Sequence, residues 1–542
     1  MKKFFVCLVI LSMILCCVPT LAFANGNPDN VTSVSKSKEA TELDEQFNSE
    51  ITLSLPSAEE QLVTDVVFVL DKSTSTDVEE EAVAMLENLK DQVMETGAKL
   101  NVGIVIFNRQ ANNVLELTEL NEENMARIEA AMTEDISSGT NLHAGIMAGK
   151  TMLDNDKSTD ADRKYMIVVS DGITYMYNES PTVVAGYWLS DGSPYFSRDP
   201  YSWQFKYESN DAPDDWDAWM SDAEKAVAAN EGRYADVPYD ETLTAETAAL
   251  LEGEYATSVD KALYLSYETY QAAVDAGYHC YALTAGTGTE YAWGPSFMNY
   301  LGGGADASFE DIQNDIAYAV STGSYVIDTM GNDELDGKAY DFDLVNDLSK
   351  IDVLVGGEAL SKEEIADDHY GFGKTENGYR FELIYYPDGT ESSDGEECIK
   401  WMINENISNF NRVQLVYSVH LTNPQTEEGT YGQYDRDGSQ GLEGLYTNNR
   451  AVLYPIDSSG AAGEPEEFNK PTVSYVVEKQ DVTDPDDPGQ TTDPGNDDGT
   501  GTAQGTDTPK TGDSGSMYAG IAVMAVSAAA FVLLCIRRRA AR

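Results

Sequence analysis

The segment TDVVFVLDKSTST, residues 64–76, joins an apolar run to a polar turn. The run covers residues 66–70, a length typical of a strand buried on both faces, as the central strands of parallel sheets are. After the turn, apolar residues recur at three- and four-residue spacing from Val78 to Val93, which predicts a helix that Gly97 can end. The segment therefore predicts a buried strand followed by a helix.

Apolar runs of strand length recur at residues 102–107, 165–169 and 278–283. Helical patterns precede the last run, over about 258–276, and follow it, over about 308–320. Because strands alternate with helices, we predict an α/β domain with a doubly wound parallel sheet. Ligands bind such a sheet beyond the carboxyl ends of its strands. The residues just after each strand are therefore the candidates for a site.

Polar residues follow two of these strands. Asp71, Ser73 and Ser75 come after the first strand, and Asp171 comes after the run at 165–169. Thr140 lies between them in the chain, in a Gly-Thr turn before a helical stretch. These residues resemble the metal-ion-dependent adhesion site of von Willebrand factor A domains, which combines D-x-S-x-S, such a Thr, and an Asp after the fourth strand. The resemblance implies that all five residues hold a metal ion.

The chemistry of these residues favours a hard cation. Hydroxyl and carboxylate oxygens with no His or Cys among them suit Mg²⁺, with Mn²⁺ or Ca²⁺ as alternatives. The resemblance implies that one coordination position stays open for a carboxylate of a binding partner. D-x-S-x-S alone is better explained by a helix cap and a turn, so the assignment depends on Thr140, Asp171 and the strand context. Thr74 stands where many members have Gly, and His143 is expected at the surface.

A long insertion, residues 178–255, separates Asp171 from the next helix. It holds many Tyr and Asp and four Trp, at positions 188, 203, 216 and 219. Aromatic residues with acidic neighbours are typical of an adhesive surface, although for most of them a small core within the insertion is the simpler explanation. Because the insertion starts beside Asp171, we expect it to begin on the metal face of the domain.

The sequence pattern changes after residue 320. Short alternating runs, separated by turn clusters as in a β-sandwich, lie at 351–355, 379–385, 398–403, 413–421, 451–454 and 472–477. Apolar and polar residues also alternate over residues 34–55. We therefore predict an all-β sandwich domain over 321–479 whose first strands come from residues 25–62, with the von Willebrand factor A domain of residues 63–320 inserted between them. This arrangement resembles pilus-tip adhesins and wall-anchored surface proteins of Gram-positive bacteria.

Such proteins often carry a self-made Lys–Asn isopeptide bond between the first and last strands of a β domain. The bond requires a buried neutral Lys, an Asn in contact with it and an acid that moves the proton. The segment GLYTNN resembles the Asn-bearing segment, and Lys36 or Lys38 lies in the matching first strand. We select Lys38 and Asn448, with Glu405 as a trial candidate for the acid. The alternative is an exposed Lys and an ordinary Asn turn.

The N-terminal end of the chain predicts export. Residues 1–24 contain two Lys, an apolar run and a small-x-small pattern, which are the parts of a secretory signal peptide. The mature protein would then begin at Asn25. Far downstream, residues 480–507 are rich in Asp, Pro, Gly and Thr, so they cannot form a core and predict a disordered, extended linker.

The C-terminal end resembles the cell-wall sorting signal of Gram-positive surface proteins. An apolar stretch at 517–536 is long enough for a transmembrane helix, and the basic tail at 537–542 marks its cytoplasmic side. The resemblance implies that a sortase cuts the preceding pentapeptide after its second Thr and joins the chain to peptidoglycan or to a pilin. A plain membrane anchor is the alternative. The pentapeptide, in which Thr replaces the usual Leu, consists of Thr508, Pro509, Lys510, Thr511 and Gly512.

The composition argues against several functions. The chain of 542 residues has 34 Lys plus Arg against 94 Asp plus Glu, a formal net charge of -60. Nucleic acid is therefore not an expected partner, because phosphate contacts need clustered cations. The sequence contains no zinc-binding spacing, nucleophile elbow or P-loop, so no enzyme is predicted. Cys280 and Cys398 are expected to be two separate buried thiols, with a disulfide as the alternative.

Together these features predict a secreted adhesin anchored to the Gram-positive cell wall. Its cation would accept an acidic group, an exposed Asp or Glu, of a host or extracellular-matrix protein. A structural pilus or surface-assembly component without a host ligand is the alternative hypothesis. A secreted enzyme whose site lies in the insertion is the third.

Overall fold

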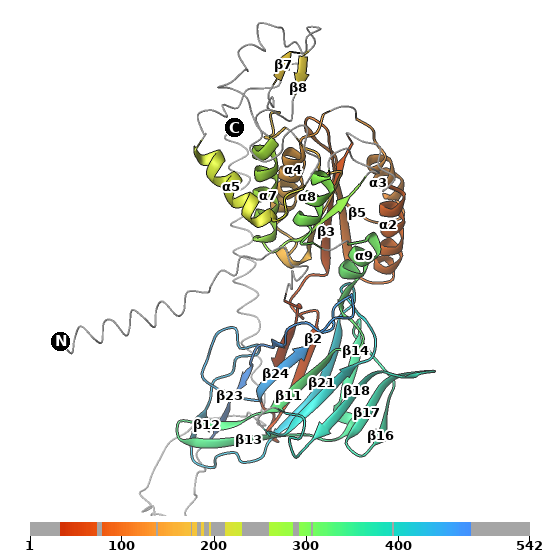
Figure 1. Ribbon diagram of the computed structural model, residues 1–542. Helices are drawn as coiled ribbons and strands as arrows, with labels where there is room; N and C mark the ends of the chain where they lie inside the picture. The colour runs from red at the N-terminus through yellow and green to blue at the C-terminus, as the bar shows by residue number, and fades with distance from the viewer. Residues whose placement is uncertain are drawn as a thin grey trace, which may run out of the picture. The chain divides into compact units, whose positions relative to one another are not determined.

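The computed structural model describes most of the chain between residues 33 and 478. The described residues belong to one compact unit, in which an α/β domain and a β domain are distinguished (Figure 1). Ser73, Ser75, the signal peptide, the linker and the sorting signal lie outside the described residues. Within the described part of the chain, no helix is long and apolar enough to cross a bilayer. The described ranges are 33–72, 79–136, 139–174, 176–181, 212–229, 259–285, 292–304, 307–392 and 395–478, with the backbone of 186–188 and 194–196.

A five-stranded sheet forms the centre of the α/β domain. Its strands, in spatial order, are β5 (Ala111–Glu119), β4 (Lys99–Phe107), β3 (Val63–Asp71), β6 (Lys164–Ser170) and β9 (His279–Thr284). β4, β3, β6 and β9 run parallel, as the apolar runs predict. β5 runs antiparallel at the edge. The sequence pattern does not predict β5, because its sequence ANNVLELTE is mostly polar and a short turn joins it to β4.

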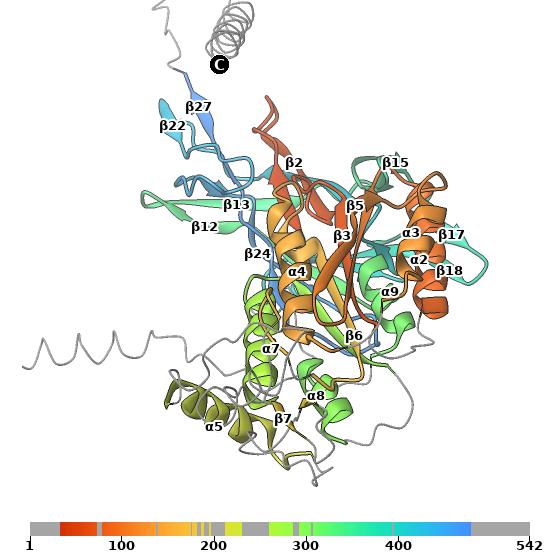
Figure 2. The ribbon, with the colours of Figure 1, turned by 90° about the horizontal axis from the view of Figure 1, so that it is seen from above.

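Helices cover both faces of this sheet (Figure 2). They are α2 (Glu79–Met94), α3 (Met125–Met132), α4 (Leu142–Asn155), α5 (Trp216–Ala229), α7 (Val259–Val274), α8 (Trp293–Leu301), α9 (Phe309–Ala317) and the 3-10 helix η1 (Ala161–Arg163). Val66 and Phe68 of β3 share a core with α2, α3 and α9. Val67 and Val69 share the opposite core with α4, α7 and α8. This two-sided burial explains why β3 is continuously apolar.

The final helix of the α/β domain is shorter than the sequence predicts. The pattern favours a helix to residue 320, but α9 ends at Ala317. Residues after it form β10 (Tyr318–Val320), which pairs with β20 (Ile407–Ser408) of the β domain. Tyr and Val favour strands, and a partner strand contributed by the other domain supplies the backbone hydrogen bonds that a last helical turn would have made.

The described part of the insertion contains α5. Trp216 and Trp219, on this helix, are both buried. The ring of Trp216 lies 5.4 Å from that of Trp219 and 5.4 Å from that of Phe297, and its indole N–H donates to Ser296 Oγ at 2.9 Å. These two Trp therefore pack against α8 as part of the core, and the adhesive-surface interpretation does not apply to them.

Two seven-stranded sheets make up the β domain and enclose one apolar core. The first sheet contains β1 (Ser37–Ala40), β2 (Asn48–Leu55), β21 (Val413–Leu421), β13 (Lys338–Leu344), β12 (Asn332–Leu335), β14 (Asp352–Val355) and β15 (Glu358–Ala359). The second contains β16 (Lys362–Ala366), β17 (His369–Thr375), β18 (Gly378–Tyr386), β19 (Cys398–Ile403), β11 (Tyr325–Met330), β24 (Asn448–Tyr454) and β25 (Glu466–Glu467). The arrangement is a β-rich domain of sandwich type.

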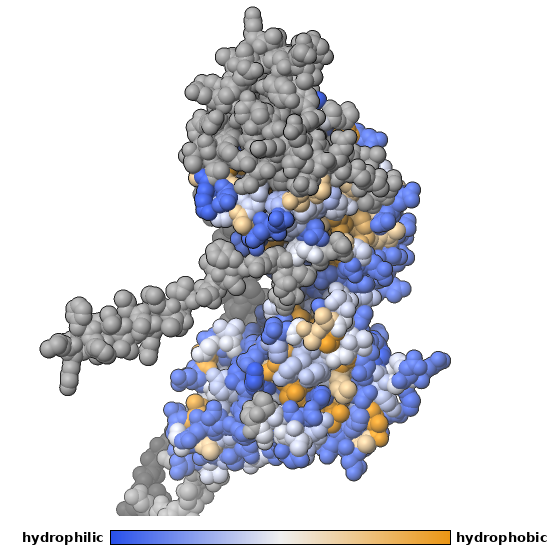
Figure 3. Space-filling model, in the orientation of Figure 1, coloured by the Kyte–Doolittle hydropathy of each residue, from blue (hydrophilic) through white to orange (hydrophobic). Residues whose placement is uncertain are grey.

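Short elements complete the described structure. They are the hairpin β7 (Gly186–Trp188) and β8 (Pro194–Phe196), the pairs β22 (Gly429–Tyr431) with β27 (Tyr475–Val477) and β23 (Leu445–Tyr446) with β26 (Thr472–Val473), and the 3-10 helix η2 (Leu348–Lys350). Figure 3 shows a mainly hydrophilic face with scattered apolar residues, in keeping with the acidic composition.

Strands from before and after the α/β domain meet in the first sheet. β2, which precedes the α/β domain, pairs antiparallel with β21, which follows it, so that Ile51 lies opposite Tyr417. β1 pairs with β2. Because of this pairing, the β domain is complete only when both ends of the described chain come together. Cys280 and Cys398 are both buried, one in each domain.

Candidate functional site

Two buried carboxylates lie at the carboxyl end of the α/β sheet. Asp71 ends β3 and Asp171 follows β6, and these strands are neighbours. Their exposed fractions are 1% and 6%. One carboxylate oxygen of Asp71, Oδ2, accepts a hydrogen bond from Ser170 Oγ at 2.6 Å, while Asp171 Oδ1 accepts from the backbone N–H of Ile173 at 2.8 Å. Both acidic side chains are thus held in fixed orientations at one edge of the sheet.

The loop of Thr140 is joined to the loop that follows β6. Thr140 is buried, and its carbonyl accepts from the backbone N–H of Met176 at 3.2 Å. In return, Thr174 Oγ1 accepts from the N–H of Leu142 at 3.2 Å. Gly139, with a φ of 87°, allows the turn before Thr140. The structure therefore brings the segments of Asp71, Thr140 and Asp171 to the same end of the sheet.

Lys72, the residue after β3, forms an ion pair with the first residue of α2. Its backbone N–H donates to the carbonyl of Phe107, and its ammonium group donates to Glu79 Oε1 at 2.5 Å, at the start of α2. Within the described residues, no three His, Cys, Asp or Glu side chains gather as a metal-binding group, so a cation here would depend on hydroxyl ligands as well.

His143, in the first turn of α4, serves as a neutral acceptor. The expectation that it lies at the surface is wrong, because the residue is only 6% exposed. Burial lowers the pKa of His143 to about 4, with a smaller contribution from the charge of Lys261. Its Nδ1 accepts from the backbone N–H of Asn178 at 3.0 Å. His143 therefore fixes the first residue of the insertion to the helix that begins at the Thr140 turn.

These residues fit a hard divalent cation. Asp71, Thr140 and Asp171 offer oxygen atoms only, which are the ligands of such cations. A neighbouring positive charge would also offset the cost of burying two ionised carboxylates. Ser73 and Ser75, the two other expected ligands, lie outside the described residues. A bound cation would supply an electrostatic attachment point for an anionic ligand group.

A second cluster of polar residues lies buried inside the β domain. Lys38 comes from β1 and Asp328 from β11, and they are 1% and 0% exposed. Lys38 Nζ donates to both carboxylate oxygens of Asp328, at 2.7 and 2.8 Å. Asn448, at the start of β24, donates from Nδ2 to Asp328 Oδ1 at 2.8 Å. The amine, the carboxylate and the amide named in an isopeptide reaction therefore meet in one hydrogen-bonded cluster.

Two hydroxyl groups complete this cluster. Tyr417, fully buried in β21, donates from Oη to Asp328 Oδ2 at 2.6 Å and accepts from Asn448 Nδ2 at 2.9 Å. Thr447 Oγ1 donates to Asn448 Oδ1 at 2.9 Å. The amide of Asn448 is therefore oriented at both of its ends, because its nitrogen and its oxygen each have fixed partners.

The electrostatics of the cluster favour a reactive amine. Burial lowers the pKa of Lys38 to about 8, although the charge and hydrogen bond of Asp328 oppose this change. A Lys with such a pKa is neutral far more often than an exposed one, and only the neutral amine is a nucleophile. Burial also raises the pKa of Tyr417 well above its usual value, with the charge of Asp328 acting in the same direction. Tyr417 therefore keeps its proton.

Glu405, the trial candidate for the acid, is the wrong residue. Its carboxylate forms two hydrogen bonds of 2.7 Å with Arg380 on the surface of the β domain. Lys36, the alternative amine, pairs with Glu466. The acid in contact is Asp328. A signal for it exists in the sequence YVIDTM, because an Asp occupies an inward-facing position of β11 between Val326 and Met330, where an apolar residue would be expected.

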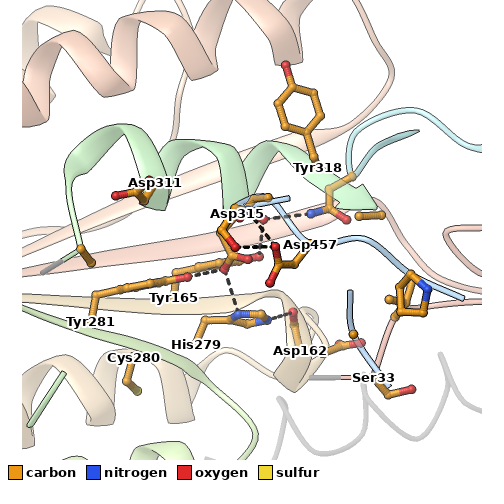
Figure 4. A pocket seen from close by; sticks show the side chains of 18 of the residues that line it. Ser33, Asp162, Tyr165, His279, Cys280, Tyr281, Asp311, Asp315, Tyr318 and Asp457 are labelled. Atoms are coloured by element: carbon orange, nitrogen blue, oxygen red, sulfur yellow. Dashed lines mark hydrogen bonds and ion pairs between the residues drawn. The ribbon is translucent and has the colours of Figure 1, made fainter. Parts of the chain in front are cut away.

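A cavity of about 730 Å³ lies beside the start of β9 and is lined by residues of both domains (Figure 4). His279 Nδ1 lies 3.2 Å from Asp315 Oδ2, its Nε2 lies 3.0 Å from the carbonyl of Asp162, and its ring stacks on Tyr165 at 4.4 Å. Tyr281 also donates to Asp315. Burial raises the pKa of Asp315, but the hydrogen bonds from His279 and Tyr281 outweigh this effect and leave it lowered. These groups satisfy one another.

Comparison with known families assigns the α/β domain. Residues 65–190 match the family model of the von Willebrand factor type A domain. The chain therefore contains a von Willebrand factor type A domain, as the D-x-S-x-S resemblance implies. A search of curated proteins finds no match.

Among solved structures, the chain is similar to several pilus proteins at low identity. The pilus adhesin SpaC from Lactobacillus rhamnosus GG is 17% identical with a TM-score of 0.33, over 82% of this chain and 48% of SpaC. Mfa5, a type V pili tip protein from Porphyromonas gingivalis, is 13% identical with a TM-score of 0.29, over 81% and 77%. The tip pilin GBS104 from Group B Streptococcus agalactiae is 12% identical with a TM-score of 0.24, over 82% and 92%. The chain spans about half the length of SpaC.

Proposed function

We propose that the protein is a surface adhesin whose α/β domain binds an acidic group of a host or matrix protein through Mg²⁺ or a similar cation. The observation that carries the proposal is the pair of buried carboxylates, Asp71 and Asp171, at the ends of two adjacent central strands. Open α/β sheets bind their ligands at this edge, beyond the carboxyl ends of the strands. Thr140, with Ser73 and Ser75, would add hydroxyl ligands.

The charge of the protein supports a role for the cation. A chain with a formal net charge of -60 repels other acidic molecules at long range. A bound divalent cation reverses the local field and gives a partner's carboxylate a point of attachment. Binding would therefore depend on the cation and would weaken as salt screens the attraction.

The test uses the processed chain, residues 25–511, which is the product expected after signal peptidase and sortase have cut. Immobilised processed chain is exposed to a panel of matrix proteins with Mg²⁺ and with a chelator. The proposal predicts Mg²⁺-dependent capture that Asp71→Ala abolishes. Asp91→Ala is the matched control, since Asp91 on α2 has a side chain that is 76% exposed. Capture that survives both the chelator and Asp71→Ala contradicts the proposal, and no capture at all favours a structural pilus component.

We further propose that the β domain forms an amide bond between Lys38 Nζ and Asn448 Cγ. The hydrogen-bonded cluster of Lys38, Asp328 and Asn448 carries this proposal, with Asp328 as the acid that moves protons. The bond would link β1 of one sheet to β24 of the other. It would thereby fasten the start of the domain to its end, on either side of the inserted α/β domain.

The mass of the processed chain tests the bond. Amide formation releases one ammonia, so the chain should be about 17 Da lighter than its sequence mass. Lys38→Ala and Asn448→Ala should each restore the full sequence mass of the variant. A processed wild-type chain with the full mass contradicts the cross-link.

We also propose that residues 508–512 attach the protein to the cell wall or to a pilus. The order of pentapeptide, apolar span and basic tail supports this proposal. A sortase would join Thr511 to an amine of peptidoglycan or of a pilin. Cells that lack sortase should release the protein or keep it in the membrane, whereas unchanged wall attachment would contradict the proposal.

A further inference from the structure

The hydroxyl group of Tyr417 lies between the two atoms that must exchange a proton in the cross-linking reaction. Oη is 2.6 Å from Asp328 Oδ2 and 2.9 Å from Asn448 Nδ2. Asn448 Nδ2 is the nitrogen that leaves as ammonia. Tyr417 therefore contacts the acid and the departing atom at once.

We propose that Tyr417 is a catalytic residue of this reaction and relays a proton from Asp328 to the departing nitrogen of Asn448. The inference rests on the proposed Lys38–Asn448 cross-link and adds a proton donor for its leaving group. Neither sequence spacing nor the strand pattern points to this role.

The reaction balances with these groups alone. The neutral amine of Lys38 attacks Cγ of Asn448, and a bond forms between Nζ and Cγ. Asp328 takes one proton from Nζ at Oδ2, which lies 2.8 Å from it. In the tetrahedral intermediate, Nδ2 has a lone pair that can accept a proton. Oδ2 then gives its proton to Tyr417 Oη while Oη gives its own to Nδ2, the Cγ–Nδ2 bond breaks, and one ammonia leaves.

The relay gives a proton held at Asp328 Oδ2 a route to the departing nitrogen. Asp328 Oδ1 already faces both Lys38 and Asn448, whereas Oδ2 faces Lys38 and Tyr417. A proton taken up at Oδ2 reaches Nδ2 through the hydroxyl without any rotation of the buried carboxyl group. Because Asp328 and Tyr417 are both 0% exposed, bulk water cannot supply the proton directly.

The orientation of the amide does not depend on Tyr417 alone. Thr447 donates to the amide oxygen of Asn448, and Asp328 accepts from its nitrogen. Loss of the Tyr417 hydroxyl leaves both contacts possible. If a variant without this hydroxyl reacts more slowly, the cause is therefore the loss of proton transfer, because the amide keeps its other two contacts.

The test measures how fast the newly made processed chain loses mass. Wild-type chain and Tyr417→Phe are made by cell-free synthesis, and intact mass is followed over time. The relay predicts a rate at least about 10²-fold lower for Tyr417→Phe, the usual effect of losing a positioned acid or base. Tyr385→Phe is the matched control, because Tyr385 also donates to a carboxylate of the β domain, that of Glu397 at 2.8 Å, and its rate should equal that of wild type.

A second variant separates proton transfer from a structural role. Replacement of Tyr417 by 3-fluorotyrosine keeps the hydroxyl but makes it more acidic, so the relay predicts a changed rate. If Tyr417→Phe loses mass as fast as wild type, the inference is overturned. An unchanged rate with 3-fluorotyrosine overturns it too, and this variant decides the matter if Tyr417→Phe does not fold. A wild-type chain that loses no mass overturns the cross-link itself, which is a different result.

Discussion

Lys38 and Asp328 face each other inside the β domain, with the amine nitrogen 2.7 and 2.8 Å from the two carboxylate oxygens. One residue comes from the first described strand and the other from the strand that follows the α/β domain. Burying an ion pair gives little net stability by itself. The proposed cross-link would give this pair a chemical role, because Asn448 donates to the same carboxylate.

Asp328→Ala should abolish the cross-link and destabilise the β domain. The variant removes the proton acceptor and leaves Lys38 buried without its carboxylate. Breaking a buried pair typically lowers the free energy of unfolding by about 3–5 kcal/mol. Intact mass and chemical denaturation measure the two effects. Asp333→Ala, in the exposed part of β12, is the control and should keep both the mass loss and the stability. A mass loss of about 17 Da in Asp328→Ala would contradict the assignment of the acid.

The rate of cross-linking should rise with pH. Burial lowers the pKa of Lys38 to about 8 in the folded chain, and the neutral amine is the nucleophile. Below that pKa the neutral fraction grows about tenfold for each pH unit, and above it the fraction levels off. Newly synthesised chain transferred to buffers between pH 6 and 9 and followed by intact mass gives this profile. A rate that falls as pH rises would contradict the proposed nucleophile.

Ser170→Ala should weaken binding of the cation without removing a proposed ligand. Ser170 Oγ donates to Asp71 Oδ2 at 2.6 Å, so its loss frees that carboxylate to reorient. Loss of such a supporting hydrogen bond typically lowers metal affinity by about 10–100-fold. Calorimetric titration with Mg²⁺ measures the change. Ser158→Ala, in an exposed turn, is a control that should leave the affinity as it is.

Asp315→Ala should lower the stability of the α/β domain, and the loss should depend on pH. Burial raises the pKa of Asp315, but hydrogen bonds from His279 and Tyr281 outweigh this effect and leave the pKa lowered in the folded state. Its contribution to stability is therefore present above the pKa of the unfolded chain and is lost as pH falls through the folded value. We expect a loss of about 1–2 kcal/mol at neutral pH. The gap between the thermal melts of wild type and variant should begin to shrink as pH falls below the unfolded-state pKa of about 3.9 and should close only below the lower folded-state pKa. A gap that stays constant with pH would contradict this role.

Much of the α/β domain could be predicted from the sequence because burial on two faces leaves a plain signal. Val66 to Leu70 must be apolar on every residue when helices cover both sides of β3. β5 lacked this signal, since an edge strand needs few apolar residues. The helix pattern up to residue 320 was misleading because the final residues form a strand with a distant partner. Its last residues pair with β20, and the partner strand lies almost ninety residues away in the chain.

The candidate sites were predictable only in part. Asp71 could be found from D-x-S-x-S, and Thr140 and Asp171 from a Gly-Thr turn and a position after a strand, as the family resemblance implies. The structure places their segments together. Their role as metal ligands stays a prediction. Asp328 and Tyr417 belong to strands far from Lys38 in the sequence, and each occupies an inward-facing position that alternation alone would assign to the core. The pairing of β11 with β24 places Asp328 beside Asn448, and the packing of the two sheets brings Tyr417 and Lys38 to them.

Titration of Mg²⁺ into metal-free processed chain measures whether the von Willebrand factor type A domain holds a cation. We expect saturable binding at one site, lost in Asp71→Ala and in Asp171→Ala but kept in Asp91→Ala. Wild-type chain that binds none of Mg²⁺, Mn²⁺ and Ca²⁺, or an Asp71→Ala variant that binds as wild type does, would contradict it.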